Sequence, residues 1–310
     1  MTPHINQPAP QTVSWCMMQR GMVILLYYIV AVVGAANVQR AIAQELYPNS
    51  EAASNSPKDV LRLRAMTTLQ NNDLFTAAKA LYSVTSDLML AGTVNVSSRL
   101  GLTASESFLT TPVFRSASLY GKMRLYNDDK PHQHLRFAAF GEYDVAPNGV
   151  SFETYMMGIK NGATLGGIGT ILLNKTAISL TASWFTPMPV GVNRLQSNIV
   201  NYSLSVGQLV LPVKYRTYTE PNLNIYCELL GFIFDGTVHE YVSTTNSASN
   251  DELHSQYSRR FHQLDLAPSA QLIVDSRAKI DFTVRVSLLN VHPSQRGWMA
   301  MLALEYYFFE

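Results

Sequence analysis

The chain has few charged residues, and neither sign of charge prevails. Asp, Glu, Lys and Arg make up 15% of the 310 residues, and the formal net charge is +1, whereas soluble domains contain roughly 25% charged residues. The hydrophobic fraction of 47% is ordinary, so the deficit lies in surface charge. A near-neutral chain has no general affinity for nucleic acid. This composition suits a protein whose outer surface faces lipid, and it also suits a soluble protein rich in Ser and Thr.

Cysteine is nearly absent. Cys16 precedes the apolar stretch near the N-terminus, and Cys227 is the second cysteine of the chain. Removal of the N-terminal region would leave Cys227 alone, which excludes an intramolecular disulfide. We therefore expect Cys227 to be a buried or lipid-facing apolar residue, and stability to come from another source.

Long hydrophobic runs are missing except near the N-terminus. Arg20 precedes the uncharged stretch GMVILLYYIVAVVGAA at 21–36, and residues 41–43 form an A-x-A cleavage pattern. This order is typical of a secretory signal peptide, which we place at residues 1–43. A cut after Ala36 and an uncleaved anchor remain open, although about 16 apolar residues are short for a spanning helix, which needs about 20. Residues 44–57 are polar and are predicted to be flexible, either in the periplasm or folded into the lumen of the following domain.

The rest of the chain is rich in alternation of apolar and polar residues. In RAKIDFTVRVSLL (277–289), the even-numbered residues from Ile280 to Leu288 are apolar, and the odd-numbered residues from Lys279 to Ser287 are polar or charged. The same pattern recurs in SLYGKMRLY, LRFAAFGEY, TAISLTASW and NLNIYCEL. A period of two predicts β-strands with one apolar face.

The pattern predicts an all-β protein of about twelve strands, with ten to fourteen possible, in an antiparallel transmembrane β-barrel. The expected strands lie near 60–68, 86–98, 114–126, 134–145, 152–160, 163–173, 176–186, 200–211, 222–234, 264–274 and 278–290, and in the C-terminal run from 297. Residues 71–84 are predicted to form a short helix or a loop insert. Strands of about ten residues, joined alternately by short and long connections, are typical of such barrels, and we place the barrel at residues 58–310.

Charged residues on the polar face of these strands are the candidate lining of the lumen. They are Arg62, Arg64, Lys122, Arg124, Arg136, Glu142, Glu228, Lys279, Asp281, Arg285 and Glu305. Opposite charges can neutralise one another in a wet interior, whereas a Lys or Arg on the lipid face costs about 2–4 kcal/mol at mid-membrane. A solvent-exposed sheet face would show the same pattern, so a soluble secreted β-sandwich or lipocalin-like protein remains an alternative.

Aromatic residues gather near the ends of the expected strands, as in the girdles at the two membrane interfaces. They are Phe114, Tyr126, Tyr143, Trp184, Tyr202, Trp298, Tyr306 and Phe308. The last strand carries an unbroken apolar row that ends in Tyr306 and Phe308. This ending resembles the C-terminal strand of bacterial outer-membrane proteins, which implies outer-membrane lipid and the barrel assembly machinery as partners.

Five stretches spread along the chain carry a further resemblance. They are LYPNSEAASNSPKDVLRLR, SASLYGKMRLYNDDKPHQHLRFAAFGEY, NYSLSVGQLVLP, NLNIYCELLG and LDLAPSAQLIVDSRAKIDF. Together they resemble a group of outer-membrane β-barrel proteins of the Bacteroidota that have no assigned function. The resemblance implies a location in the bacterial outer membrane, and it supplies neither a substrate nor catalytic residues.

Motifs for catalysis, cofactors or metals are not evident. His132 and His134 have an H-x-H spacing, which could hold a metal with a nearby aspartate as third ligand; we expect them to be turn or rim histidines. No G-x-S-x-G elbow is present, and GGIGT at 166–170 lies within a strand pattern, where glycines let strands bend or pack closely. We therefore expect no catalytic residue, no cofactor and no metal.

These features favour an outer-membrane pore or channel-like transporter of small polar solutes, with selectivity set by the charged rows of the lumen. Two alternatives stay open. One is an outer-membrane enzyme or surface-binding barrel with a closed lumen, whose long loop around 241–260 forms the working surface. The other is the soluble secreted β-sandwich. No nucleic-acid partner is expected.

Overall fold

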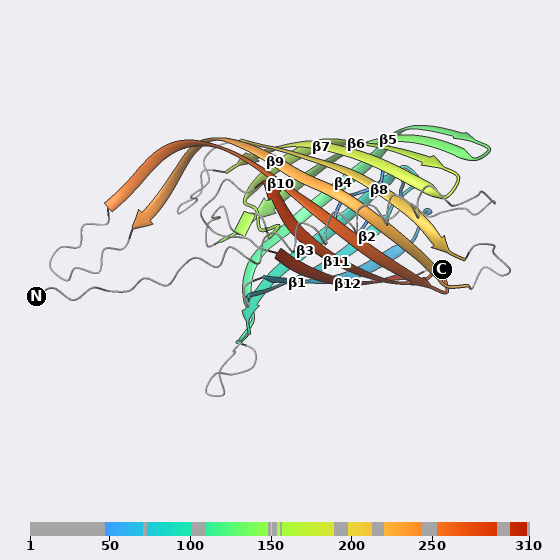
Figure 1. Ribbon diagram of the computed structural model, residues 1–310, viewed down its shortest axis with the longest axis horizontal. Helices are drawn as coiled ribbons and strands as arrows, with labels where there is room; N and C mark the ends of the chain where they lie inside the picture. The colour runs from blue at the N-terminus through green and yellow to red at the C-terminus, as the bar shows by residue number, and fades with distance from the viewer. Residues whose placement is uncertain are drawn as a thin grey trace, which may run out of the picture. The chain divides into compact units, whose positions relative to one another are not determined.

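The chain forms a closed antiparallel β-barrel (Figure 1). The computed structural model describes residues 47–70, 73–100, 110–147, 150, 154–155, 157–188, 198–212, 220–242, 253–289 and 298–308. Within these residues there are twelve strands, each paired with its neighbours along the chain, and the first strand pairs with the last. The predicted fold class and strand number are confirmed. Closure pairs the backbone groups that an open sheet edge would leave exposed, which is the condition for a sheet to exist in lipid.

The strands are β1 (Leu61–Gln70), β2 (Asp73–Ser83), β3 (Leu88–Arg99), β4 (Val113–Lys130), β5 (Gln133–Val145), β6 (Gly162–Leu173), β7 (Thr176–Pro187), β8 (Ile199–Leu211), β9 (Asn222–Val242), β10 (Leu253–Val274), β11 (Ala278–Leu289) and β12 (Trp298–Phe308). Connections 84–87, 131–132, 174–175, 212–221 and 275–277 lie at one end, called here the turn end, where β1 begins and β12 ends. At the opposite end, called the loop end, each odd-numbered strand ends and the strand that follows it begins.

The prediction of a helix or loop insert at 71–84 is wrong, because this stretch contains β2. Alanine favours helices, and the alanines of this stretch suggested one. Pairing on both sides decides otherwise: Ala78 is in register with Ala65 of β1 and with Val94 of β3. Ala78 and Ala80 are exposed on the outer face, where small apolar residues are compatible with lipid.

The strand expected at 152–160 is also wrong. Thr154 and Tyr155 form a helical turn, and Met157 and Gly158 form a turn in which Gly158 has a φ of 82°. This positive φ is readily adopted by glycine and interrupts an extended strand. One strand was missed, β2, and one was predicted where none forms, at 152–160. The predicted number of strands is therefore correct although these two assignments are wrong.

The hairpin of β9 and β10 is longer than expected. These strands have 21 and 22 residues and extend at the loop end in Figure 1. Much of the stretch expected to be a long loop at 241–260 is therefore strand, and 243–252 lie outside the described residues. The predicted signal peptide at 1–43 and residues 44–46 also lie outside them.

The outer face of the barrel is apolar. Leu119 and Leu165 are each 71% exposed, and the aromatic residues singled out above, apart from Tyr202, are 42–54% exposed. Soluble monomers rarely expose large contiguous apolar surfaces, whereas a membrane barrel requires them. Among the described residues, no helix is both long and apolar enough to cross a bilayer.

Aromatic rings lie over glycines of neighbouring strands. Gly166 is in register with Phe140, and a Cβ added to Gly166 would lie 2.5 Å from the Phe140 ring. Tyr226 lies over Gly207 and Tyr202 over Gly231 in the same way. The glycines therefore make room for rings packed flat on the sheet, as expected for GGIGT at 166–170.

Candidate functional site

The inner face of the barrel is polar and largely buried. The charged residues proposed for this face are all buried or half-buried: Arg62, Lys122, Glu228, Lys279, Asp281 and Glu305 are buried, and Arg64, Arg124, Arg136, Glu142 and Arg285 are partly buried. Their strand neighbours face the other way, since Ile280 and Phe282 are 39% and 50% exposed while Lys279 and Asp281 are 2% and 0% exposed.

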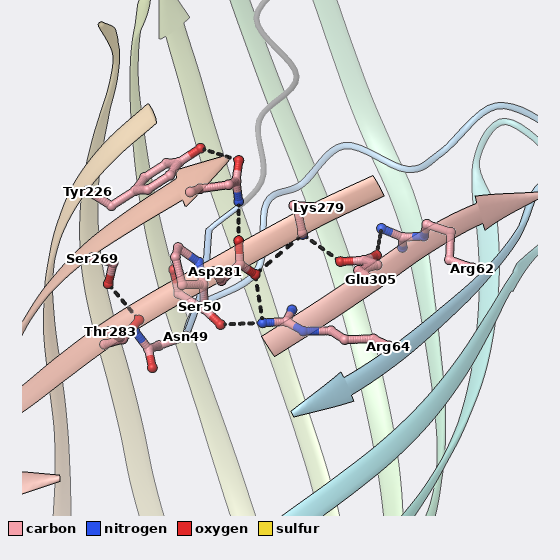
Figure 2. A network of polar contacts seen from close by, with 12 residues as sticks. Asn49, Ser50, Arg62, Arg64, Tyr226, Ser269, Lys279, Asp281, Thr283 and Glu305 are labelled. Carbon is pink, nitrogen blue, oxygen red and sulfur yellow. Dashed lines mark hydrogen bonds and ion pairs between the residues drawn. The ribbon is translucent and has the colours of Figure 1, made fainter. Parts of the chain in front are cut away.

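A chain of ion pairs joins β1, β12 and β11 (Figure 2). Glu305 Oε1 accepts from Arg62 Nη1 at 3.2 Å, and Glu305 Oε2 forms an ion pair with Lys279 Nζ at 2.5 Å. Asp281 lies 3.8 Å from Lys279 Nζ and accepts from Arg64 Nη2 at 3.2 Å. Buried charges are tolerated when they are paired and hydrogen-bonded, so cations and carboxylates alternate along this wall.

Hydrogen bonds extend this wall to β10 and β9. Asp281 Oδ1 accepts from Gln271 Nε2 at 2.9 Å, and Gln271 Oε1 accepts from the Tyr226 hydroxyl at 3.0 Å and from Asn224 Nδ2 at 3.1 Å. Arg285 belongs to a separate pair, with Nε 2.6 Å from Asp265 Oδ2. Both groups hold inward side chains in fixed positions.

Residues 47–57, called here the N-terminal segment, lie against this inner wall. Glu228 accepts hydrogen bonds from the main-chain N–H groups of Asn49 and Ser50 at 3.1 and 2.9 Å, and from their side chains at 2.6 and 2.7 Å. Arg64 donates to the carbonyl of Pro48 at 2.8 Å. Of the two positions considered for residues 44–57, the described part occupies the lumen and is hydrogen-bonded there.

Glu51 is the charged centre of the N-terminal segment. Its carboxylate lies 3.2 Å from Lys79 Nζ and 3.6 Å from Lys122 Nζ, and it accepts from the Tyr120 hydroxyl at 2.6 Å. Burial raises the pKa of Glu51, but the charges of Lys79 and Lys122 lower it by more, so this pKa lies well below its ordinary value. The segment is therefore bound to the wall by an ionised carboxylate.

Main-chain groups of the N-terminal segment complete its attachment. Lys122 donates to the carbonyls of Ala52 and Ser54 at 2.8 and 2.9 Å, and the N–H of Ala53 donates to Thr170 Oγ1 at 2.9 Å. With those to Arg136, Ser179 and Ser205, the hydrogen bonds and ion pairs of the segment reach β1, β2, β4 to β9 and β11. A segment bound to strands on so many sides crosses the lumen.

A cavity of about 460 Å³, called here the chamber, lies inside the barrel next to this segment. Residues 48–51 form one boundary, and Tyr155, Met157, Gly158 and Lys160 of the β5–β6 connection form another. The Tyr155 hydroxyl donates to Asn201 Oδ1 at 2.9 Å, and Lys160 Nζ donates to Glu142 Oε2 at 2.8 Å. Burial lowers the pKa of Lys160, but Glu142 and Asp144 raise it by more, so its pKa is raised overall.

Arg124 and Arg136 belong mainly to the turn end. Arg124 Nη2 lies 2.6 Å from Asp87 of the β2–β3 connection. Arg136 Nη2 lies 3.1 Å from Asp129, which also contacts His134 Nδ1 at 2.7 Å. His132 forms the β4–β5 turn, and within the described part of the chain no group of three His, Cys, Asp or Glu could hold a metal.

Sequence reasoning missed four charged residues that line the chamber: Glu51, Lys79, Asp144 and Lys160. Lys79 was overlooked because β2 was not predicted as a strand. Lys79, Leu81 and Ser83 are nevertheless two residues apart, as the inward residues of a strand are. Asp144 ends the polar row of β5 that contains Glu142, and this row could have been followed two residues further. For Glu51 and Lys160, which lie outside the strands, no periodic signal exists.

A closed barrel with an apolar exterior and a polar, ion-paired interior defines the class of a transmembrane β-barrel.

No protein-family model matches the chain, and no curated protein matches it. Several solved structures are similar in fold. The COG4313 outer membrane channel from Pseudomonas putida F1 is 12% identical with a TM-score of 0.47, covering 85% of this chain and 100% of the channel. The NanC porin is 8% identical with a TM-score of 0.42, covering 81% and 99%. Salmonella typhi OmpF is 9% identical with a TM-score of 0.25, covering 80% and 96%. Likeness at this level carries no information on what the barrel does.

Proposed function

We propose that the chain is a pore of the bacterial outer membrane that passes small polar solutes, and that its own N-terminal segment holds it shut. Bacterial barrels have short periplasmic turns and longer extracellular loops. Four of the five connections at the turn end have two to four residues, whereas five of the six at the loop end have eight or more. The first strand also begins and the last strand ends at the turn end, so we assign this end to the periplasm. The N-terminal segment would then close the lumen from the periplasmic side.

The observation that carries the proposal is how the N-terminal segment is attached. Most of its contacts with the wall are hydrogen bonds and ion pairs, centred on Glu228, Glu51 and Lys122. Its apolar contacts are those of Tyr47, which packs on Tyr226, and of Ala52 and Ala53. Water can replace the polar partners when the segment leaves, so the apolar surface exposed on release is limited to the contacts of these three side chains. Removal would uncover a lumen lined by charged and hydroxyl side chains, which suits hydrated solutes.

The test is conductance in planar bilayers. We would compare the full chain, a variant lacking residues 47–57, and this deletion combined with Tyr155→Ala, which trims the boundary on the loop side. We expect rare openings in the full chain and sustained current in one or both deletion variants. Heat-modifiable gel mobility identifies correctly closed barrels. If both deletion variants fold and pass no current, the pore proposal is wrong.

One observation favours a second function, a barrel with a closed lumen that binds a ligand. The chamber is bounded by the N-terminal segment on one side and by the β5–β6 connection on another. Such a barrel would retain a ligand without conducting. The folded deletion variants distinguish the two functions, because a binding barrel stays silent and a pore conducts.

A further inference from the structure

The chamber has a polar sector and an apolar sector. Glu142, Asp144 and Thr164 line it from β5 and β6. The apolar lining includes Met66, Met299, Met301, Phe140, Phe232 and Tyr155. At about 460 Å³ the chamber falls in the size range of small-molecule sites. An occupant matching both sectors would carry a polar head and an apolar body.

Asp144 is the unusual residue of the polar sector. It is 2% exposed, and its Oδ2 atom has no hydrogen-bond partner among the described residues. Glu142, by contrast, is paired with Lys160, and Glu51 is paired with Lys79. A buried carboxylate oxygen without a hydrogen-bond partner costs free energy. Asp144 is therefore the acceptor in the chamber that a bound hydrogen-bond donor would satisfy.

Thr164 adds a second unsatisfied oxygen beside it. Thr164 is 2% exposed, and its Oγ1 atom has no hydrogen-bond partner in the described structure. Thr164 is in register with Glu142, two residues from Asp144 on the adjacent strand. Inward side chains in this diagonal relation lie about 7–8 Å apart or less, so a multivalent donor placed between the two side chains lies near both oxygens.

The charge balance selects the sign of the donor. Two ammonium groups lie near Glu142 and Asp144: that of Lys160 is bonded to Glu142, and that of Lys79 is paired with Glu51. Neither forms an ion pair with Asp144 among the described residues. An anionic group would be repelled by Asp144, whereas a cation would neutralise it. The described residues offer no group of three carboxylate, His or Cys ligands for a metal ion, and sulfur and aromatic surfaces suit an organic cation.

We propose that the chamber is a binding site for small organic ammonium ions, with the ammonium on Asp144 and Thr164 and the apolar body against the methionines and aromatic rings. This inference deepens the proposed function, because such a solute is the one the pore would pass. Binding itself does not require conduction. An ammonium supplies three N–H donors, which matches the two unsatisfied oxygens and leaves one donor for water.

The test is calorimetric titration of the detergent-solubilised full chain and of the variant lacking residues 47–57, at pH 7. The probe is 2-phenylethylamine, compared with 2-phenylethanol and phenylacetate, which share the ring and differ in the head group. We expect saturable binding of the amine, at least tenfold weaker binding of the alcohol, and no binding of the anion. Asp144→Asn, which keeps the shape, should weaken amine binding at least tenfold. Asp73→Asn, at an exposed ion pair with Arg99, should leave it unchanged.

Three outcomes would overturn the ammonium site. They are equal affinity for amine and alcohol, unchanged amine binding in Asp144→Asn, and absence of saturable binding in both protein forms. Equal affinity would mean that only the apolar sector binds. This test can fail without contradicting the pore proposal, because bilayer current is measured without amine. A barrel that conducts and does not bind the amine would support the pore and contradict the ammonium site.

Discussion

The attachment of the N-terminal segment predicts that Glu228→Gln opens the barrel. Glu228 is fully buried, and its two oxygens accept from the main-chain N–H groups and the side chains of Asn49 and Ser50. Glutamine has the same size, but its amide replaces one acceptor oxygen with a donor that faces other donors. The substitution therefore acts on the segment's attachment while preserving the volume of the side chain.

The magnitude follows from the bonds that are lost. A hydrogen bond to a charged group contributes about 1.5–3 kcal/mol, and such contributions are not additive. Loss of the bonds on one oxygen, partly compensated by water, gives about 3 kcal/mol, which is roughly a hundredfold change in an equilibrium. The ratio of released to bound segment should therefore rise roughly a hundredfold.

The assay is single-channel recording of the full-length chain and of Glu228→Gln at equal protein load. We expect the open fraction to rise in the variant, and Asp275→Asn, at an exposed turn position where Asn tolerates the φ of 51°, to behave as the unmodified chain. A folded Glu228→Gln barrel with an unchanged open fraction would refute the view that Glu228 holds the segment.

Three further predictions concern the wall, the segment and the packing of the strands. Val284→Arg should impair barrel assembly, because a cation on the lipid face costs about 2–4 kcal/mol at mid-membrane, while Arg285→Ala should assemble normally; gel mobility before and after heating measures both. Since the folded-state pKa of Glu51 is lowered from 4.5, its contribution to segment binding is fully present above that pH and is lost as the pH falls below it. The open fraction should therefore stay constant from pH 7 to about 5 and rise only in stronger acid. Gly166→Ala should destabilise the barrel by about 1–3 kcal/mol through overpacking against the Phe140 ring, as measured by urea unfolding, and should cost less when Phe140 is already Ala.

Each of these predictions has its own control. Equal assembly of Val284→Arg and Arg285→Ala would contradict the assignment of the two faces. For the pH profile, Glu51→Gln should remove the acid-dependent part of the opening, and an unchanged profile in that variant would place the titrating group elsewhere. An equal cost of Gly166→Ala with and without Phe140 would show that the ring is not what the glycine accommodates.

The inward and outward faces of the barrel wall could be predicted from the sequence because the alternation of a strand is a local pattern. Alternation along 277–289 separates Lys279 and Asp281 from Ile280 and Phe282, and the structure buries the first pair and exposes the second. β2 was missed because its alanines obscure the period, and the strand is decided by partners that lie elsewhere in the chain. In the stretch expected to be a strand at 152–160, the described residues Thr154 and Tyr155 form a helical turn and Met157 and Gly158 form a turn.

The sequence alone therefore predicted eleven of the twelve strands and their two faces and favoured a membrane barrel, since these depend on residues two apart in one strand. Only the tertiary structure decided what fills the lumen. Glu51 meets Lys79 and Lys122, and Asp144 remains without a partner, because closure of the sheet brings distant strands around a common interior. Contacts across that interior have no sequence period, and no local pattern encodes them.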